Sequence, residues 1–345
     1  MALERAFAVT GDTGRVIVIA GNAHIPHITA QTSSFSTAQK KRLIIIGEPA
    51  AKNTAPAIAC AAIYSLLVNK NKNNRKMLVL TSDHIIKPLA SFKKDAALAA
   101  AAAGEGKLAV FGIPPTRPET GYGYIEAVSR EQRTKNGEQS AGKKENKVLN
   151  VVRFHEKPDM ATAEKYSTSG KFFWNSGMFA FSIDFISRQF REFAEDVFTP
   201  FEKLKEPKKE DYTVSRGVKI LKGWKGLKAA YNKAKSISFD FAIAEKCRDA
   251  VMVQTSFDWI DIGNWEEYIK ICDKNDSVVF NASSRNCYID SDIPVAIAGA
   301  DDLIVVIRNG KNGEPAVALI TRKGHTQNVR EITEQIKKSG RSELL

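Results

Sequence analysis

The residues best suited to chemistry stand at the end of an apolar segment, Val152–Pro158 (VRFHEKP). Its Glu156-Lys157 pair can hydrogen-bond a hydroxyl with one side chain and a phosphate with the other. A later segment, Trp174–Phe179 (WNSGMF), carries Asn175, whose amide offers the donor and the acceptor that suit a vicinal diol. Together these residues predict a pocket for a sugar phosphate. The alternative is an ordinary strand-turn-strand with exposed charges.

Two carboxylates that are distant in the sequence predict a metal site. Asp83, in Thr81–His84 (TSDH), follows the end of an apolar run. Asp261 precedes a glycine turn in Asp258–Trp265 (DWIDIGNW). Carboxylates at such positions can hold Mg²⁺ between nucleotide phosphates. The alternatives are a helix N-cap for Asp83 and a turn aspartate bonded to its own backbone for Asp261.

Two further motifs could contact a ligand. In Thr116–Glu126 (TRPETGYGYIE), glycines alternate with tyrosines, so the backbone can approach a ligand while an aromatic ring supplies a wall. An ordinary β-turn would show the same pattern. Glu48–Ala57 (EPAAKNTAPA) is a loop that enters a helix, which Asn53 or Thr54 can cap. Simple helix punctuation explains that motif equally well.

The elements that position these residues alternate between strand and helix through the first two thirds of the chain. We expect strands over 15–20, 42–46, 77–81 and 107–112, and helices over 56–69 and 92–103. Strands separated by helices of this length predict parallel crossovers and a doubly wound α/β sheet. Ligands of such sheets bind at the carboxyl ends of the strands, where Asp83 and Glu156-Lys157 fall.

The pattern changes after Trp265, and we expect one domain over 1–265 and a smaller one over 266–345. Short strands are expected in the smaller domain over 277–280, 287–289, 295–298, 303–307 and 316–320, followed by a helix over 328–338. This unit is either a short sandwich or a few coils of β-helix. Residues 128–147 are polar and lack periodicity, which predicts an exposed loop between two strands.

Composition and charge limit the class of protein. The 345 residues are 43% hydrophobic and 26% charged, with a formal net charge of +12. The excess favours anionic partners, but the lysine-rich runs lack the interleaved aromatics of a base-stacking surface, which argues against nucleic acid. Four scattered cysteines without zinc-like spacing indicate a reducing cytoplasm. No apolar run is long enough for a membrane span.

Seven motifs together resemble one family, the mannose-1-phosphate guanylyltransferases, which belong to the sugar-phosphate nucleotidyltransferases. They occur in the family's order along nearly the whole chain: EPAAKNTAPAIA, SDHII, TRPETGYGYIE, FHEKP, WNSGMF, SFDFAIAEK and DWIDIGNW. The resemblance implies a Rossmann-like nucleotidyltransferase sheet followed by a short β-helix-like domain and a terminal helix. Longer bifunctional relatives continue into an isomerase domain beyond the final GRSELL, so one activity is implied.

The implied reaction joins α-D-mannose 1-phosphate and GTP to give GDP-mannose and pyrophosphate, with Mg²⁺ as cofactor. By motif match the catalytic residues would be Asp83, Lys157 and Asp261, of which the two aspartates bind the metal. Lys157 would hold the sugar phosphate. The residues implied near the sugar are Gly121, Tyr122, Gly123, Tyr124, Glu156 and Asn175. Those implied near the nucleoside are Glu48, Pro49, Asn53, Thr54 and Ser82. A homodimer is compatible with the resemblance.

One feature of the family is missing. Its members begin with a strand and a loop of the type GGxGxRLxPLS around the triphosphate, and the nearest candidate here, Val16–Asn22 (VIVIAGN), matches the family's second strand instead. We therefore expect the chain to start inside the first helix, about 25–30 residues short, with an interrupted sheet and little GDP-mannose synthesis by these 345 residues. The alternatives are a non-catalytic sugar-nucleotide-binding or regulatory homologue, and an enzyme for another sugar or base.

Overall fold

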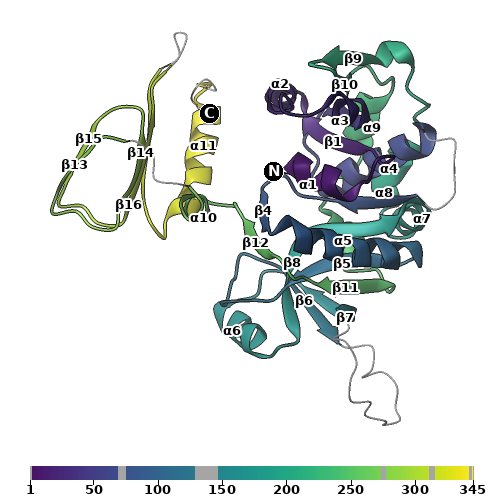
Figure 1. Cartoon of the computed structure of the whole chain (residues 1–345), viewed down its shortest axis with the longest axis horizontal. Helices are drawn as coiled ribbons and strands as arrows, with labels where there is room; N and C mark the ends of the chain where they lie inside the picture. Colours follow the sequence, from purple (N-terminus) through teal and green to yellow (C-terminus); the bar gives the residue numbers. More distant parts are fainter. Residues whose placement is uncertain are drawn as a thin grey trace. The chain divides into compact units, whose positions relative to one another are not determined.

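The chain folds into two compact units. The computed structural model describes residues 2–68, 75–128, 147–272, 277–310, 315–341 and 344 (Figure 1). The first unit comprises Met1–Ser82 and Ile86–Trp259, and the second comprises Asp83–Ile85 and Ile260–Leu345. The division therefore lies between residues 259 and 260, where we expected it at 265. Of the polar loop predicted over 128–147, residues 129–146 lie outside the described residues.

One sheet of the first unit has the strand order β1-β2-β10-β9. The strands are β1 (Val16–Gly21), β2 (Leu43–Glu48), β10 (Val218–Leu221) and β9 (Tyr212–Ser215). β2 runs parallel to both of its neighbours, as the predicted crossovers require. Along β2, Leu43 and Ile45 enter one hydrophobic cluster, and Ile44 and Ile46 enter another. Both faces of this strand are therefore covered.

The other sheet of the first unit has the order β3-β8-β5-β11-β7-β6, and β6 also pairs with β8. The strands are β3 (Lys76–Val79), β8 (Phe172–Ser182), β5 (Leu108–Ile113), β11 (Ala250–Gln254), β7 (Val148–His155) and β6 (Tyr124–Val128). β8 is antiparallel to both β3 and β5. β3 and β5 therefore run parallel to each other, as the predicted crossovers require, and β8 lies between them as an antiparallel strand that the sequence did not predict there.

Helices cover both faces of this six-stranded sheet, as Figure 1 shows for α5 (Leu89–Gly104) along β5 and β8. Leu108 and Val110 of β5 pack in one cluster with four helices: α4 (Thr54–Val68), α7 (Ile183–Phe193), α8 (Glu195–Glu202) and α9 (Leu227–Lys233). Ala109 and Phe111 pack on the opposite face against α5. The remaining helices of the unit are α1 (Ala2–Val9), α2 (Ile25–Gln31), α3 (Thr37–Arg42) and α6 (Met160–Thr168).

Among the described residues of the first unit, the four-stranded and the six-stranded sheet are separate from each other. Among the described residues, β1 pairs with β2 alone and β3 pairs with β8 alone, so each ends its sheet. Residues 16–21 therefore form an edge strand and do not occupy a central position.

The described residues of the second unit form short β-strands and two α-helices. The strands are β13 (Val279–Ala282), β14 (Tyr288–Ser291), β15 (Val295–Ala298), β16 (Leu303–Arg308) and β17 (Val317–Arg322). β13 pairs in parallel with β15, and β14 with β16. In both pairs the opposed residues are 16 positions apart in the sequence. The backbone amide of Arg285 likewise donates to Oδ1 of Asp301, 16 residues further on. Parallel pairing at a fixed offset identifies coils of β-helix rather than a sandwich.

The helices of this unit are α10 (Trp265–Ile269) and α11 (Val329–Lys338), so the predicted terminal helix is confirmed. Within the described part of the chain, every helix is too short or too polar to cross a membrane.

Candidate functional site

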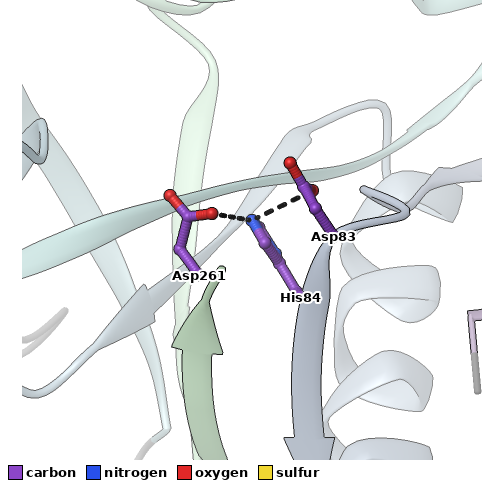
Figure 2. A group of neighbouring side chains, drawn as sticks. All are labelled: Asp83, His84 and Asp261. Atoms are coloured by element: carbon purple, nitrogen blue, oxygen red, sulfur yellow. Dashed lines mark ion pairs between the residues drawn. The ribbon is translucent and has the colours of Figure 1, made fainter. Parts of the chain in front are cut away.

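The two predicted metal ligands meet in the second unit. Asp83 immediately precedes β4 (His84–Lys87), and Asp261 ends β12 (Asp258–Asp261), which pairs with β4. The amide of Ile262 donates to the carbonyl of Asp83 at 3.2 Å, which holds the two strand ends together. Side-chain ligand atoms of Asp83, His84 and Asp261 all lie within 4.8 Å of one another (Figure 2).

The electrostatics of this cluster favour a cation. Nε2 of the buried His84 lies 3.9 Å from Oδ1 of Asp83 and 3.9 Å from Oδ1 of Asp261. Burial, together with the negative charges of Asp83 and Glu267, raises the pKa of Asp261 to about 6. A bound divalent ion would remove that repulsion. Two carboxylates fit a hard cation, and His84 is a third donor that we did not predict, although it follows Asp83 directly in the sequence.

The predicted sugar residues meet in the first unit, where the ends of three strands adjoin. Tyr124, the first residue of β6, lies opposite His155 of β7 and also opposite Trp174 of β8. The residues that flank these three positions are Gly123, Glu156 and Asn175. They are therefore neighbours in space although they come from three separate segments.

Short distances confirm this convergence. The backbone amide of Asn175 donates to the carbonyl of Gly123 at 2.8 Å. A Cβ atom placed on Gly123 would lie 2.9 Å from Oε2 of Glu156 and 3.7 Å from Cβ of Asn175, so the glycine leaves room for the Glu156 carboxylate in its present position. Lys157 Nζ lies 3.7 Å from Oε1 of Glu156. The structure thus brings together four of the residues that the sequence predicted.

The backbone of Lys157 is in an unfavourable conformation. Its φ is +40°, in the left-handed region, and Pro158 follows it. A residue with a Cβ atom pays about 1–2 kcal/mol for this conformation. Such strain is typical of functional sites, where the surrounding structure fixes a side chain in a required direction.

Two acids beside this cluster were not predicted as site residues. Asp240 begins η4 (Asp240–Ala244), a single turn of π-helix, and its Oδ1 accepts a hydrogen bond from Nδ2 of Asn175 at 2.7 Å. Burial raises the pKa of Asp240. Burial and the charges of Glu156 and Asp240 raise the pKa of Glu245. The SFDFAIAEK motif contains both acids, but a π-helical turn cannot be recognised from sequence spacing.

Residues of the glycine-tyrosine loop differ in their exposure. The amide of the exposed Gly121 donates to Oε1 of Glu119 at 3.1 Å. The ring of Tyr122 packs edge-on against Trp174 and Trp259, at centroid distances of 5.4 and 5.2 Å. Tyr124 is fully buried, and its hydroxyl accepts the amide of Glu119 at 3.0 Å. Its side chain therefore supports the loop from the core.

The predicted nucleoside residues follow β2 and begin α4. Oε1 of Glu48 is buried without a hydrogen-bond partner among the described residues, and burial raises the pKa of this carboxyl. Asn53 has a φ of +69° and accepts the amide of Thr54 at 2.9 Å. The hydroxyl of Thr54 does not cap the helix but accepts the amide of Phe239 at 2.8 Å.

The remaining two predicted nucleoside residues are less constrained. Pro49 is half-buried in the loop between β2 and α4, and Ser82 is exposed in the segment between β3 and β4. No described contact brings either side chain to Gly123, Glu156, Lys157 or Asn175, which together are called the sugar cluster.

Comparisons with known proteins agree with this fold. A family model described as nucleotidyl transferase matches residues 5–277. The xanthan biosynthesis protein XanB of Xanthomonas campestris pv. campestris (strain B100) is 34% identical over 334 residues, which are 93% of this chain and 64% of that protein. A mannose-1-phosphate guanylyltransferase of Escherichia coli (strain K12) is 34% identical over 306 residues, covering 87% and 59%. The chain thus spans about 60% of the length of these relatives.

A solved structure shares the fold over nearly the whole chain. It is described as a mannose-1-phosphate geranyltransferase from Thermus thermophilus, and it matches with a TM-score of 0.67 and 22% identity. The match covers 94% of this chain and 99% of that one. With the family model matching most of the sequence, the chain belongs to the nucleotidyl transferase family.

Proposed function

We propose that this chain transfers GMP from GTP to α-D-mannose 1-phosphate, which gives GDP-mannose and pyrophosphate. The observation that carries the proposal is the convergence of Glu156, Lys157 and Asn175 beside Gly123. This cluster offers a cation for a phosphate and polar groups for sugar hydroxyls. The name of the Escherichia coli relative supports the choice of sugar and base.

In the proposed reaction, an oxygen of the sugar phosphate attacks the α-phosphorus of GTP. The new bond joins that oxygen to phosphorus, and the bond from the α-phosphorus to the bridging oxygen of the β-phosphate breaks. Pyrophosphate leaves with that electron pair. Such a transfer needs positioning and charge neutralisation more than covalent participation by the protein.

Each sugar-site residue has a distinct task in this proposal. The ammonium of Lys157 neutralises the sugar phosphate before it attacks. Glu156 accepts a hydrogen bond from a sugar hydroxyl, and Asn175 binds a neighbouring hydroxyl pair. Gly123 lets its backbone approach the sugar ring, with Tyr122 in the adjoining wall. Glu48, Pro49, Asn53, Thr54 and Ser82 are proposed to lie near the nucleoside.

A divalent ion fits the carboxylates of Asp83 and Asp261, and we propose Mg²⁺ there. When bound, it supplies positive charge for the phosphates of GTP. The carboxylates of Asp83 and Asp261 would hold the ion, and the buried His84 would offer a third donor atom. Asp261 must be deprotonated to bind, so its raised pKa makes the affinity for the ion fall below about pH 6.

Ligand selectivity tests this proposal. Isothermal titration calorimetry would compare α-D-mannose 1-phosphate with glucose 1-phosphate, mannose 6-phosphate and inorganic phosphate. We expect mannose 1-phosphate to bind most tightly, and GTP to bind better with Mg²⁺ than without it. Equal affinity for all four phosphates would contradict a sugar-specific pocket, and tighter binding of another sugar 1-phosphate would replace mannose in the proposal.

A further inference from the structure

Among the described residues, Asp240 makes the shortest polar contact of the sugar cluster. It comes from a segment about 65 residues beyond Asn175, and its Oδ1 accepts the hydrogen bond from Nδ2 of Asn175 at 2.7 Å. A bond of this length to a carboxylate is charge-assisted and stronger than a bond between neutral groups. Asp240 is half-buried at the start of η4, so its own position is fixed by a packed element.

This contact determines which way the amide of Asn175 faces. Oδ1 of Asn175 accepts the backbone amide of Gly177 at 3.1 Å, while Nδ2 donates to Asp240. A flipped amide would place a carbonyl oxygen against the carboxylate and an NH₂ group against an N–H donor. Both contacts would then be repulsive. The second N–H of Nδ2 and the second lone pair of Oδ1 are left for a ligand, and the positions of this donor and this acceptor are fixed.

The segment before Asp240 is held from the opposite side. The carbonyl of Ile237 accepts the amide of Ala55 at 3.2 Å, and the amide of Phe239 donates to the hydroxyl of Thr54 at 2.8 Å. Residues 237–240 therefore connect the first turn of α4 to Asn175 through hydrogen bonds. Because α4 carries Thr54, the same segment touches a proposed nucleoside residue and a proposed sugar residue.

We propose that Asp240 is a positioning residue that fixes the donor and acceptor sense of Asn175 and thereby sets selectivity for the configuration of a vicinal hydroxyl pair. This inference rests on the proposed function, because it assumes that Asn175 binds the sugar. Asp240 acts through Asn175 and does not itself need to touch the substrate. Its carboxylate oxygen is the group that matters, so asparagine should replace it better than alanine.

The first test needs no ligand. The side-chain NH₂ group of Asn175 gives a pair of signals in a ¹⁵N-correlated NMR spectrum, which Asn175→Asp would identify by their loss. In the full chain we expect Asp240→Ala to move this pair clearly, and Asp184→Asn, an exposed acid in the first turn of α7, to leave it in place. An unmoved Asn175 pair in Asp240→Ala would overturn the proposal.

The second test measures selectivity by calorimetry. Loss of a charge-assisted hydrogen bond corresponds to a change in the dissociation constant of about tenfold or more. Asp240→Ala should therefore weaken mannose 1-phosphate binding by about that factor. It should also reduce the preference of the protein for mannose 1-phosphate over glucose 1-phosphate. Asp240→Asn should restore most of the affinity. GTP affinity should hold in both variants, because the backbone contacts to α4 remain.

The outcomes separate the two proposals. Unchanged mannose 1-phosphate affinity and selectivity in Asp240→Ala would refute the role of Asp240 while the proposed function stands. Equal loss of GTP and sugar phosphate binding in Asp240→Ala would indicate a merely structural role. If the wild-type chain binds no sugar phosphate, the proposed function fails, and with it the selectivity role, although the NMR shift still decides the contact between Asp240 and Asn175.

Discussion

At the scale of single residues, Lys157 combines features that a structural lysine does not need. Its side chain is 62% exposed, and its ion pair with Glu156 is 3.7 Å long. An exposed pair of this kind contributes at most about 1 kcal/mol to stability. Its left-handed backbone costs a similar amount. Stability therefore does not explain Lys157, whereas binding of a phosphate would.

We predict that Lys157→Ala weakens mannose 1-phosphate binding by about 10- to 100-fold, because it removes a charged hydrogen bond to the sugar phosphate. GTP binding and the melting temperature should change little. Calorimetry with both ligands measures the split. Lys165→Ala, at an exposed lysine of α6, is the matched control. An equal loss of both ligands would count against a sugar-phosphate role.

The raised pKa of Asp261 predicts how the free energy of unfolding depends on pH. Its folded-state pKa is raised to about 6, so the folded protein binds the proton more tightly than the unfolded chain. The contribution of this group to the free energy of unfolding therefore falls as the pH rises from about 4 to about 6. Without divalent ions, Asp261→Asn should raise the melting temperature at pH 8 more than at pH 4.5.

Added Mg²⁺ should oppose this effect. It should raise the melting temperature of the wild-type protein at pH 8, and should do so weakly at pH 4.5 or in Asp261→Asn. Differential scanning calorimetry with and without the ion gives all four comparisons. If the melting temperature of Asp261→Asn depended on pH and Mg²⁺ as that of the wild type does, Asp261 would neither account for the pH dependence nor bind the ion.

At the scale of elements, the sites depend on which strands become neighbours, and the sequence indicates this only in part. The end of β7 was predictable from an apolar run that stops at Glu156-Lys157. The insertion of β8 between β3 and β5 was not, because an apolar run does not reveal its partners. Asp240 was missed for a related reason. Its π-helical turn reaches Asn175 through tertiary packing that has no local signature.

Gly123 tests the element-scale account, because it lies where β6, β7 and β8 adjoin. We predict that Gly123→Ala weakens mannose 1-phosphate binding by about tenfold, since its Cβ would lie 2.9 Å from Oε2 of Glu156 and displace that side chain. The fold should survive, because the displaced atom ends a flexible side chain. Gly21→Ala, with its nearest contact at 3.5 Å, is the control. Unchanged binding in Gly123→Ala would separate Gly123 and Glu156 from the sugar site.

At the scale of the whole molecule, the order of motifs predicted more than the periodicity did. Periodicity indicated an α/β unit followed by short strands, and both are present. It left the C-terminal unit open between a sandwich and a β-helix, which parallel pairing at a 16-residue offset decides. It also could not show that Asp83–Ile85 belong to the second unit, because that depends on the pairing of β4 with β12.

The central claim is GMP transfer to mannose 1-phosphate, and turnover tests it most directly. Pyrophosphate and GDP-mannose would be measured together, with GTP, mannose 1-phosphate and Mg²⁺, using the chain with whatever coding sequence precedes it in frame. We predict that the two products form in equal amounts, that both require all three components, and that Asp261→Asn abolishes them. Tight binding of mannose 1-phosphate without any turnover would contradict the claim and identify a sugar-phosphate-binding protein instead.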